Sequence, residues 1–149
     1  DEHNGQGKAY FTWVYGCQAV ELTVNRKTGK VKLLNAVAAH DVGRGVNKAM
    51  LEGQFFGGMA MGIGYALHEE LIQDGGRIIN TNLNAYRIPR SLDMPEMKAI
   101  IIENPDPQSP SGAKSIGEPT NELMAPAVAN AIYHATGTRH HRLPIRVQR

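Results

Sequence analysis

The hydrophobic pattern of the first forty residues is typical of two paired strands. Residues 1–9 are polar and contain glycine, so we expect a loose arm. Residues 10–24 are rich in aromatic and β-branched side chains, which favour a strand. Residues 25–30 predict a hairpin turn, with Gly29 suited to a positive φ, and residues 31–40 form the returning strand. The apolar side chains expected on one face of that strand are Val31, Leu33 and Val37.

A long helix is expected over residues 48–70. Asn47 precedes it with a side chain suited to N-capping, and Gly75 and Gly76 follow it. Each glycine inside a helix costs about 0.5–1 kcal/mol relative to alanine. The interior glycines are Gly53, Gly57, Gly58, Gly62 and Gly64. They indicate either close packing against a neighbouring element or a flat ligand lying against this helix, and the residues alone leave both open.

The second half of the chain predicts shorter elements. Residues 77–82 favour a short strand, residues 86–90 a constrained loop, and residues 97–103 an apolar strand that is rich in isoleucine. The three prolines within residues 104–112 predict a loop.

An alanine-rich second helix is expected over residues 120–136, with Gly137 as its C-cap. Residues 143–147 favour a last edge strand. Together these elements predict an α+β fold, in which a β-hairpin and a small mixed sheet pack with the glycine-rich helix and a second, C-terminal helix.

Composition narrows the class of protein. Hydrophobic residues make up 42% of the 149-residue chain and charged residues 20%, which fits one globular domain. The single cysteine, Cys17, excludes an internal disulfide and a cysteine-held metal or iron–sulfur site, and it fits a reducing, cytoplasmic location. The apolar stretch at residues 55–67 is too short to span a membrane. Basic residues gather at 139–149, either as a solvated surface or as a phosphate site, but no aromatic interleaving supports nucleic acid.

Glu118 is the most informative candidate residue. It follows the small, flexible residues 111–117 and precedes Pro119, so it lies at the start of the second helix. The residues alone favour a helix-capping role over a carboxylate held in a cleft. Lys114, four residues earlier, is placed either to pair with Glu118 or to lie on the surface.

His40 and Asp41 suggest a metal or acid–base pair, but neighbours on a regular strand point to opposite faces, so we do not expect them to share one site. We expect Asp41 to hold the glycine turn after the strand. Ser115 lacks the elbow motif of a serine hydrolase.

Four segments in order change this picture. Residues 39–47 contain an Asp-x-Gly-x-x-x-Asn turn, residues 51–70 a Gly-Gln helix that runs into Leu-x-Glu-Glu, residues 86–89 a Tyr-Arg-Ile-Pro loop, and residues 112–119 read Gly-Ala-Lys-Ser-Ile-Gly-Glu-Pro. In order and spacing, these segments resemble the C-terminal part of the molybdopterin-binding subunit of the xanthine dehydrogenase/aldehyde oxidase family. The sequence departs from many relatives at Met61, where they carry glutamine, and at Thr120-Asn121.

The resemblance implies a specific chemistry. Such enzymes hydroxylate aldehydes or N-heterocycles of the purine kind, and Glu118 matches the base that deprotonates a hydroxyl group on the molybdenum. The resemblance implies that Gln54 and Gly53 bind the pterin cofactor, together with Lys114 and Ser115. The pterin holds the metal through its dithiolene, so no metal ligand from this chain is expected.

The resemblance also implies partners. The cofactor is molybdopterin with molybdenum, either in its simple or in its cytosine dinucleotide form, and the 2Fe-2S and FAD groups lie on partner domains or subunits. Residues 1–149 then form a subdomain of a larger enzyme, inactive without the remaining molybdenum-binding part. Two alternatives stay open: a non-catalytic assembly or cofactor-binding domain with the same fold, and a phosphate-binding module, although no Walker or dinucleotide motif supports the latter.

Overall fold

The computed structural model, which describes residues 3–7, 10 and 12–147, begins with the predicted β-hairpin. Strands β1 (Gly16–Val24) and β2 (Val31–Asp41) pair antiparallel, and Gly29 adopts a φ of 71° in the turn between them. The first strand starts six residues later than predicted. Residues 3–7 form turns and bends, while the other positions of the predicted arm lie outside the described residues.

A β-bulge changes which side chains of β2 face the core. Glu21 pairs with Asn35 and Leu22 pairs with Leu33, so Leu34 is the extra residue. The buried positions therefore shift from Leu33 to Ala36, Ala38 and His40, and Val37 lies on the other face. The prediction that Val31, Leu33 and Val37 share one face was wrong, because it assumed an unbroken two-residue period.

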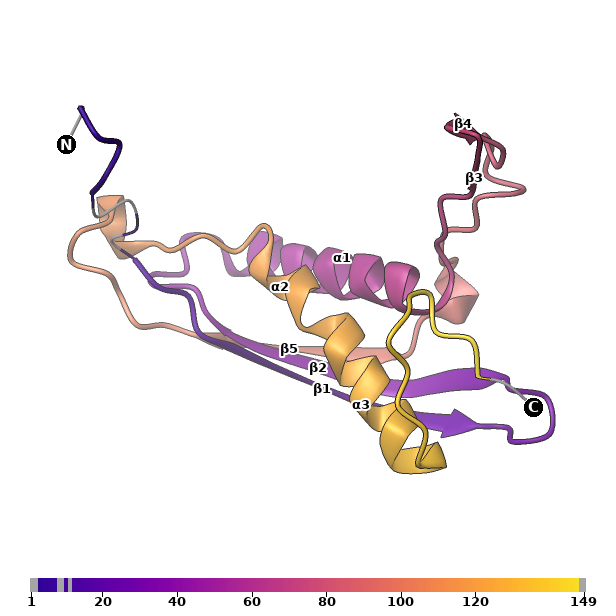
Figure 1. The fold of residues 1–149 in the computed structure, drawn as a ribbon. Coiled ribbons are helices and arrows are strands. Elements are labelled where there is room, and N and C mark those ends of the chain that lie inside the picture. Colours follow the sequence, from indigo (N-terminus) through magenta and orange to yellow (C-terminus); the bar gives the residue numbers. More distant parts are fainter. Residues whose placement is uncertain (1–2, 8–9, 11, 148–149) are drawn as a thin grey trace.

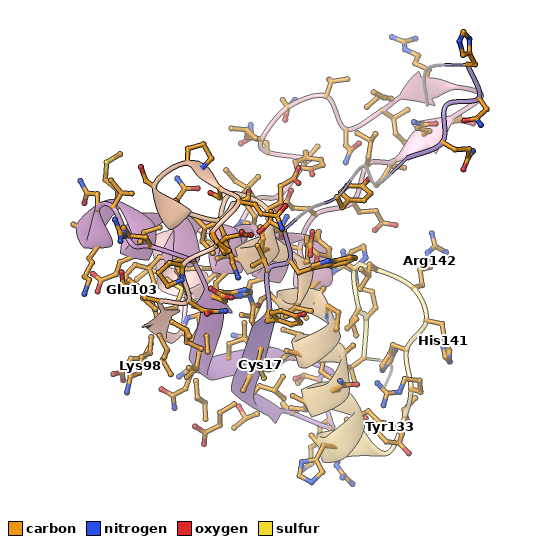
Figure 2. The ribbon with its side chains drawn as sticks, turned by 90° about the vertical axis from the view of Figure 1, so that its left-hand side faces the viewer. Cys17, Lys98, Glu103, Tyr133, His141 and Arg142 are labelled. Carbon is orange, nitrogen blue, oxygen red and sulfur yellow. The ribbon has the colours of Figure 1, made fainter. Side chains whose placement is uncertain are left out.

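Helix α1 (Lys48–Leu67) connects β2 to the parallel strand β5 (Glu96–Ile102), giving a mixed sheet of order β1-β2-β5. The predicted cap is confirmed, since the Asn47 side chain accepts a hydrogen bond of 3.1 Å from the Met50 amide. The helices cover one face of this sheet (Figure 1), with α1 packed over β5 and the last helix over β1. The other face stays open, and Cys17 on β1 and Lys98 on β5, labelled in Figure 2, belong to it.

Helix α1 ends three residues earlier than predicted. The Glu69 carboxylate folds back into the space that a side chain at Gly64 would fill, and the amide of Glu69 bonds to the Gly64 carbonyl at 2.9 Å. The Tyr86 hydroxyl donates to that carboxylate at 2.6 Å, and Pro89 packs beside Gly64. The loop at 86–90 is thus held against the end of the helix.

A small hairpin follows α1. It consists of β3 (Gln73–Asp74) and β4 (Arg77–Ile78), so the predicted strand at 77–82 is only two residues long. This hairpin projects from the body of the fold (Figure 1). Two short 3-10 turns, η1 (Ser91–Asp93) and η2 (Pro110–Gly112), lie in the later loops.

The second helix forms as two consecutive pieces, α2 (Pro119–Glu122) and α3 (Met124–Thr136). Pro126 accounts for the break. Proline has no backbone N–H to donate to the carbonyl of Glu122, four residues earlier, and its ring clashes with that carbonyl. Gly137 ends α3 with a φ of 76°, as predicted. The predicted strand at 143–147 is absent. Ile145 is buried there instead, and its amide donates to the Ala66 carbonyl at 2.7 Å.

The glycines of α1 divide into two groups. Side chains at Gly58 and Gly62 would collide with Thr120 and Met124, so these glycines allow α2 and α3 to approach α1 closely. Gly53 and Gly57 are exposed, and nothing lies within 4 Å of a side chain built there. Close packing therefore explains only part of the glycine content. The buried core of the fold includes Phe55, Met59 and Ile63 of α1 and Val128 and Ile132 of α3.

Alanine substitutions should separate the two groups. Gly62→Ala should lower the free energy of unfolding by about 1–3 kcal/mol, because its new methyl group would lie 2.5 Å from Met124 Cβ and 3.0 Å from the Asn121 carbonyl oxygen. Gly57→Ala, the matched control, should raise that free energy by about 0.5–1 kcal/mol. Denaturant unfolding of the purified proteins measures both, and a shift of the same sign in both variants would contradict this division.

Candidate functional site

Gln54 and Lys114 line the same groove although sixty residues separate them in the sequence. The groove has a volume of about 240 Å³ and lies between the end of β2, the first turns of α1 and the segment that precedes α2. Its other lining residues are Val42, Arg44, Val46, Asn47, Met50, Leu51 and Ala113. The tertiary fold thus brings together two of the residues that the motifs singled out.

The glycine turn after β2 makes this approach possible. Gly43 has a φ of 66° and pairs with Ala113 in an isolated bridge. The amide of Lys114 donates to the Val42 carbonyl at 3.0 Å, and the amide of Arg44 donates to the Gly112 carbonyl at 2.8 Å. A side chain at Gly43 would collide with the Gly112 carbonyl, so only glycine allows this contact.

Asp41 joins the two sides of the turn. One carboxylate oxygen accepts a 2.9 Å hydrogen bond from the Gly43 amide, which confirms the expected role of Asp41 in holding the turn. The other accepts from the Lys114 ammonium at 2.6 Å and from the Asn104 amide at 3.5 Å. Lys114 therefore pairs with Asp41 and not with Glu118.

The Asp41–Lys114 ion pair is buried, with only 6% of each side chain exposed. Burial alone would raise the pKa of the Asp41 carboxyl. The Lys114 ammonium and the Gly43 and Asn104 donors more than offset this and hold the pKa below its usual value. Asp41 is therefore ionised at neutral pH and binds the ammonium throughout that range.

Glu118 lies directly before α2 and is exposed. Pro119 occupies the first turn, as predicted, but the Glu118 side chain makes no hydrogen bond to the helix terminus. The capping role that the residues alone favoured was therefore wrong. The carboxylate is open to an incoming group at the end of a loop.

Thr120 fixes the chain just after Glu118. Its buried hydroxyl donates to the Gln54 carbonyl at 3.2 Å, in the space that Gly58 leaves open. Its own carbonyl accepts from the Gln18 amide at 2.7 Å. Sequence reasoning noted Thr120 only as a departure from relatives and missed Gln18. Both fix the main chain at Thr120, two residues after Glu118, and the Thr120 hydroxyl ties it to the Gln54 carbonyl.

A buried histidine, His40, contacts the Gln18 side chain that holds Thr120. The Gln18 amide nitrogen lies 2.9 Å from Nε2 of His40, so donation to this atom requires the neutral ring with its proton on Nδ1. His40 also packs edge-on against Phe55, with ring centroids 5.4 Å apart. Gly16 leaves the space that the imidazole occupies. His40 and Asp41 thus contact different parts of the protein, and His40 belongs to the core.

The remaining candidate residues are open to solvent. Gln54, Gly53 and Ser115 are all exposed. Within the part of the chain that the structure describes, no group of three or more His, Cys, Asp or Glu side chains is placed to hold a metal ion. Across the same residues, no helix is long and apolar enough to cross a membrane.

The basic C-terminal residues have intramolecular partners. Arg139 stacks on the Tyr133 ring at 4.2 Å and donates to Asn130, while Arg142 and Arg146 lie 3.6 Å from the Glu70 carboxylate. Figure 2 shows His141 and Arg142 at the outer side of this segment, away from Cys17. These contacts are typical of a solvated surface.

Comparisons with known proteins agree on one family. Residues 1–95 match the family model described as "Molybdopterin cofactor-binding domain". The chain is 41% identical over 137 residues to the xanthine dehydrogenase molybdenum-binding subunit of Escherichia coli O157:H7, which covers 91% of this chain and 18% of that protein. It is also 36% identical over 141 residues to the aldehyde oxidoreductase molybdenum-binding subunit PaoC of E. coli K12, covering 93% of this chain and 19% of that protein.

Solved structures give the same result. Quinoline 2-oxidoreductase from Pseudomonas putida 86 superposes with a TM-score of 0.76 at 35% identity, over 82% of this chain and 16% of that one. The aldehyde oxidoreductase of Desulfovibrio gigas superposes with a TM-score of 0.80 at 33% identity, over 88% and 14%. The fold described above is therefore shared with oxidoreductases of known structure.

The chain belongs to the molybdopterin cofactor-binding domain family, within the molybdenum-binding subunits of the xanthine dehydrogenase/aldehyde oxidoreductase group. This confirms the resemblance drawn from the four motifs. The chain spans less than a fifth of the length of the curated relatives it matches. Gln54 and Gly53 fall inside the matched residues 1–95, whereas Lys114, Ser115 and Glu118 follow them.

His40 should make stability depend on pH. Burial lowers the pKa of its imidazole, and the nearby charge of Glu122 opposes this in part. The unfolded chain takes up a proton below about pH 6.5 that the folded protein does not, so stability should fall as the pH drops below that value. Denaturant unfolding at a series of pH values measures the slope.

His40→Gln should reduce that slope, because the substituted side chain does not titrate. Part of the slope should remain, since burial also lowers the pKa of His68. His134→Gln changes an exposed histidine and is the matched control. An unchanged slope in His40→Gln would mean that His40 does not govern the dependence.

Proposed function

We propose that this chain supplies the catalytic base and part of the cofactor cradle of a molybdenum hydroxylase that acts on an N-heterocycle or an aldehyde. The exposed Glu118 carboxylate carries the proposal, because it is not used as a helix cap and follows by four residues Lys114, which lines the groove together with Gln54. Its position in Gly-Glu-Pro matches the base of the family.

The first turns of α1 suit a pterin ligand. The Gln54 side chain is exposed and offers an amide donor and acceptor, while its main-chain carbonyl is already bound by Thr120. Beside it, Gly53 and Gly57 leave a bare helix surface that a flat ring system can approach. Gln54, Gly53 and Ser115 would therefore contact the cofactor, and Lys114 would form the wall behind it.

When bound, the molybdenum–pterin group supplies the Lewis-acid and redox chemistry. Glu118 accepts a proton at its carboxylate from the water-derived oxygen that is transferred to the substrate. A general base of this kind must come within about 2.6–3.2 Å of the proton donor, directly or through one water molecule. A side chain at the end of an anchored loop is suited to this task.

The rest of the enzyme would complete the reaction. Hydroxylation of a C–H bond with oxygen from water releases electrons, which must leave the site. Iron–sulfur and flavin groups on partner domains or subunits would accept them. The remaining molybdenum-binding part would hold most of the cofactor, in either its simple or its cytosine dinucleotide form. The relatives that are named as molybdenum-binding subunits support such an assembly.

The alternative is a domain with the same fold that binds the cofactor or assembles the enzyme without catalysing the reaction. It differs from the proposal in one respect, which is the need for a carboxylate at position 118. Substitution of this residue therefore distinguishes the two functions.

Glu118→Gln in the complete enzyme should lower kcat by at least about 10²–10⁴-fold, because the amide cannot accept the proton. The molybdenum content should stay near that of the unmodified enzyme, since the substitution preserves the shape of the side chain. Steady-state kinetics and metal analysis measure the two quantities.

The control is Glu122→Gln, which removes an exposed carboxylate from the next turn and should keep kcat within about twofold of the unmodified enzyme. Loss of molybdenum in proportion to activity in Glu118→Gln would mean a structural role. Full turnover in that variant would favour the non-catalytic alternative.

Gln54→Leu should reduce cofactor retention. Loss of a hydrogen bond of about 1.4 kcal/mol corresponds to roughly tenfold weaker binding. The pterin and molybdenum content after dialysis measures the effect in the complete enzyme. Gln73→Leu, at an exposed position of β3, is the matched control. Equal cofactor content in the two variants would mean that Gln54 does not bind the cofactor.

A further inference from the structure

We infer that the buried Asp41–Lys114 ion pair is a positioning device for Glu118, which sets the place of the base relative to α1. The inference rests on the function proposed above. It gives Lys114 a different role from that of a direct cofactor ligand, and it adds Asp41 to the residues on which turnover depends.

The Asp41–Lys114 pair is more deeply buried than the other ion pairs of the described residues. In each of the other ion pairs among the described residues, at least one partner is more than a third exposed, whereas both side chains here are 6% exposed. A buried ion pair is a weak source of stability, because desolvation of both charges opposes their attraction. A fixed geometry is a better explanation for its presence.

The pair connects the sheet to the loop of the base. Asp41 is the last residue of β2, and its carboxylate also binds the Gly43 amide. Lys114 lies four residues before Glu118, and its amide bonds to the Val42 carbonyl at 3.0 Å. Both the main chain and the side chain of Lys114 are thus attached to the end of β2.

A second attachment lies on the other side of Glu118. Thr120 is fully buried and bonds to the Gln54 carbonyl and to Gln18. Between the two attachments, Ser115 and Gly117 are exposed, and a side chain at Gly117 would meet nothing within 4 Å. Ile116 packs partly buried against the core, and the Glu118 carbonyl accepts a hydrogen bond from the Asn121 amide at 2.9 Å. The Glu118 side chain makes no capping bond of its own, so its position follows from the main chain that Lys114 and Thr120 attach on either side.

The Lys114 ammonium is already paired with the Asp41 carboxylate. The two groups lie 2.6 Å apart, and the buried lysine side chain offers little surface to an anionic group in the groove. Its effect on catalysis is therefore indirect. Because a displacement of about 1 Å at a catalytic group can lower the rate about 100-fold, loss of this attachment should reduce turnover strongly.

The test uses the complete enzyme with Asp41→Asn, Lys114→Met and the uncharged pair Asp41→Asn with Lys114→Gln. We expect kcat per bound molybdenum to fall on the order of 10–100-fold in each, with KM changed less than about threefold. The uncharged pair leaves no isolated buried charge, so it keeps the test valid if Lys114→Met does not fold. A residue that only stabilises the fold would lower the yield of loaded enzyme but leave kcat per molybdenum unchanged.

Hydrogen exchange gives a readout that does not depend on activity. In the complete cofactor-free protein, amides in a peptide covering residues 112–118 should exchange at least about tenfold faster in the three variants, because the attachment to β2 is weakened. Lys48→Met is the matched control. It breaks the exposed ion pair with Glu103, 3.4 Å away at the same end of the fold, and Glu103 is labelled in Figure 2. It should leave both kcat and exchange unchanged.

The outcomes separate this inference from the proposed function. If Glu118→Gln abolishes turnover but the three variants keep kcat per molybdenum, Glu118 is the base and the positioning role is wrong. If Glu118→Gln retains turnover, the proposed function itself fails, whatever the pair does to exchange. Unchanged exchange in residues 112–118 in all three variants would also overturn the inference.

Discussion

The close contact between α1 and α2 holds the two halves of the candidate site together. Gly58 and Gly62 remove the side chains that would keep the segment from Thr120 to Met124 away from α1. The cost of these glycines to helix stability is offset by the buried packing that they allow, including the Thr120 hydrogen bond to Gln54. Without this approach, the segment that follows Glu118 would not contact α1 at Gln54.

A second contact of the same kind lies at the end of β2. Gly43 allows the chain at Gly112 to pass against it, and Asp41 then binds Lys114 across the junction. Both contacts combine a glycine with a buried polar side chain. Glycine provides the space, and the polar group provides direction, since a hydrogen bond or ion pair is favourable in few orientations. Such pairs suit a site that requires fixed positions from distant parts of the chain.

Local elements were largely predictable. The hairpin, the Asn47 cap, the strand predicted at residues 97–103 and the Gly137 cap depend on neighbouring residues, and the structure confirms them. The errors arose where tertiary contacts override local preference. The Glu69 side chain ends α1 early by packing on Gly64, and the segment at 143–147 uses Ile145 to cover the core and forms no strand. The bulge at Leu34 depends on pairing with β1, and the alternation of apolar and polar residues along β2 gives no clear sign of it.

The sequence by itself determined the class of this protein, because four short motifs in order specify a family that the comparisons confirm. It also marked Glu118, although local rules favoured a cap. Only the tertiary structure decided that the carboxylate makes no capping bond, that Lys114 pairs with Asp41, and that Thr120 and Gln18 support the same loop. The physical reason is that motifs record which residues are present, whereas a charge or an amide finds its partner only after distant segments have been packed together.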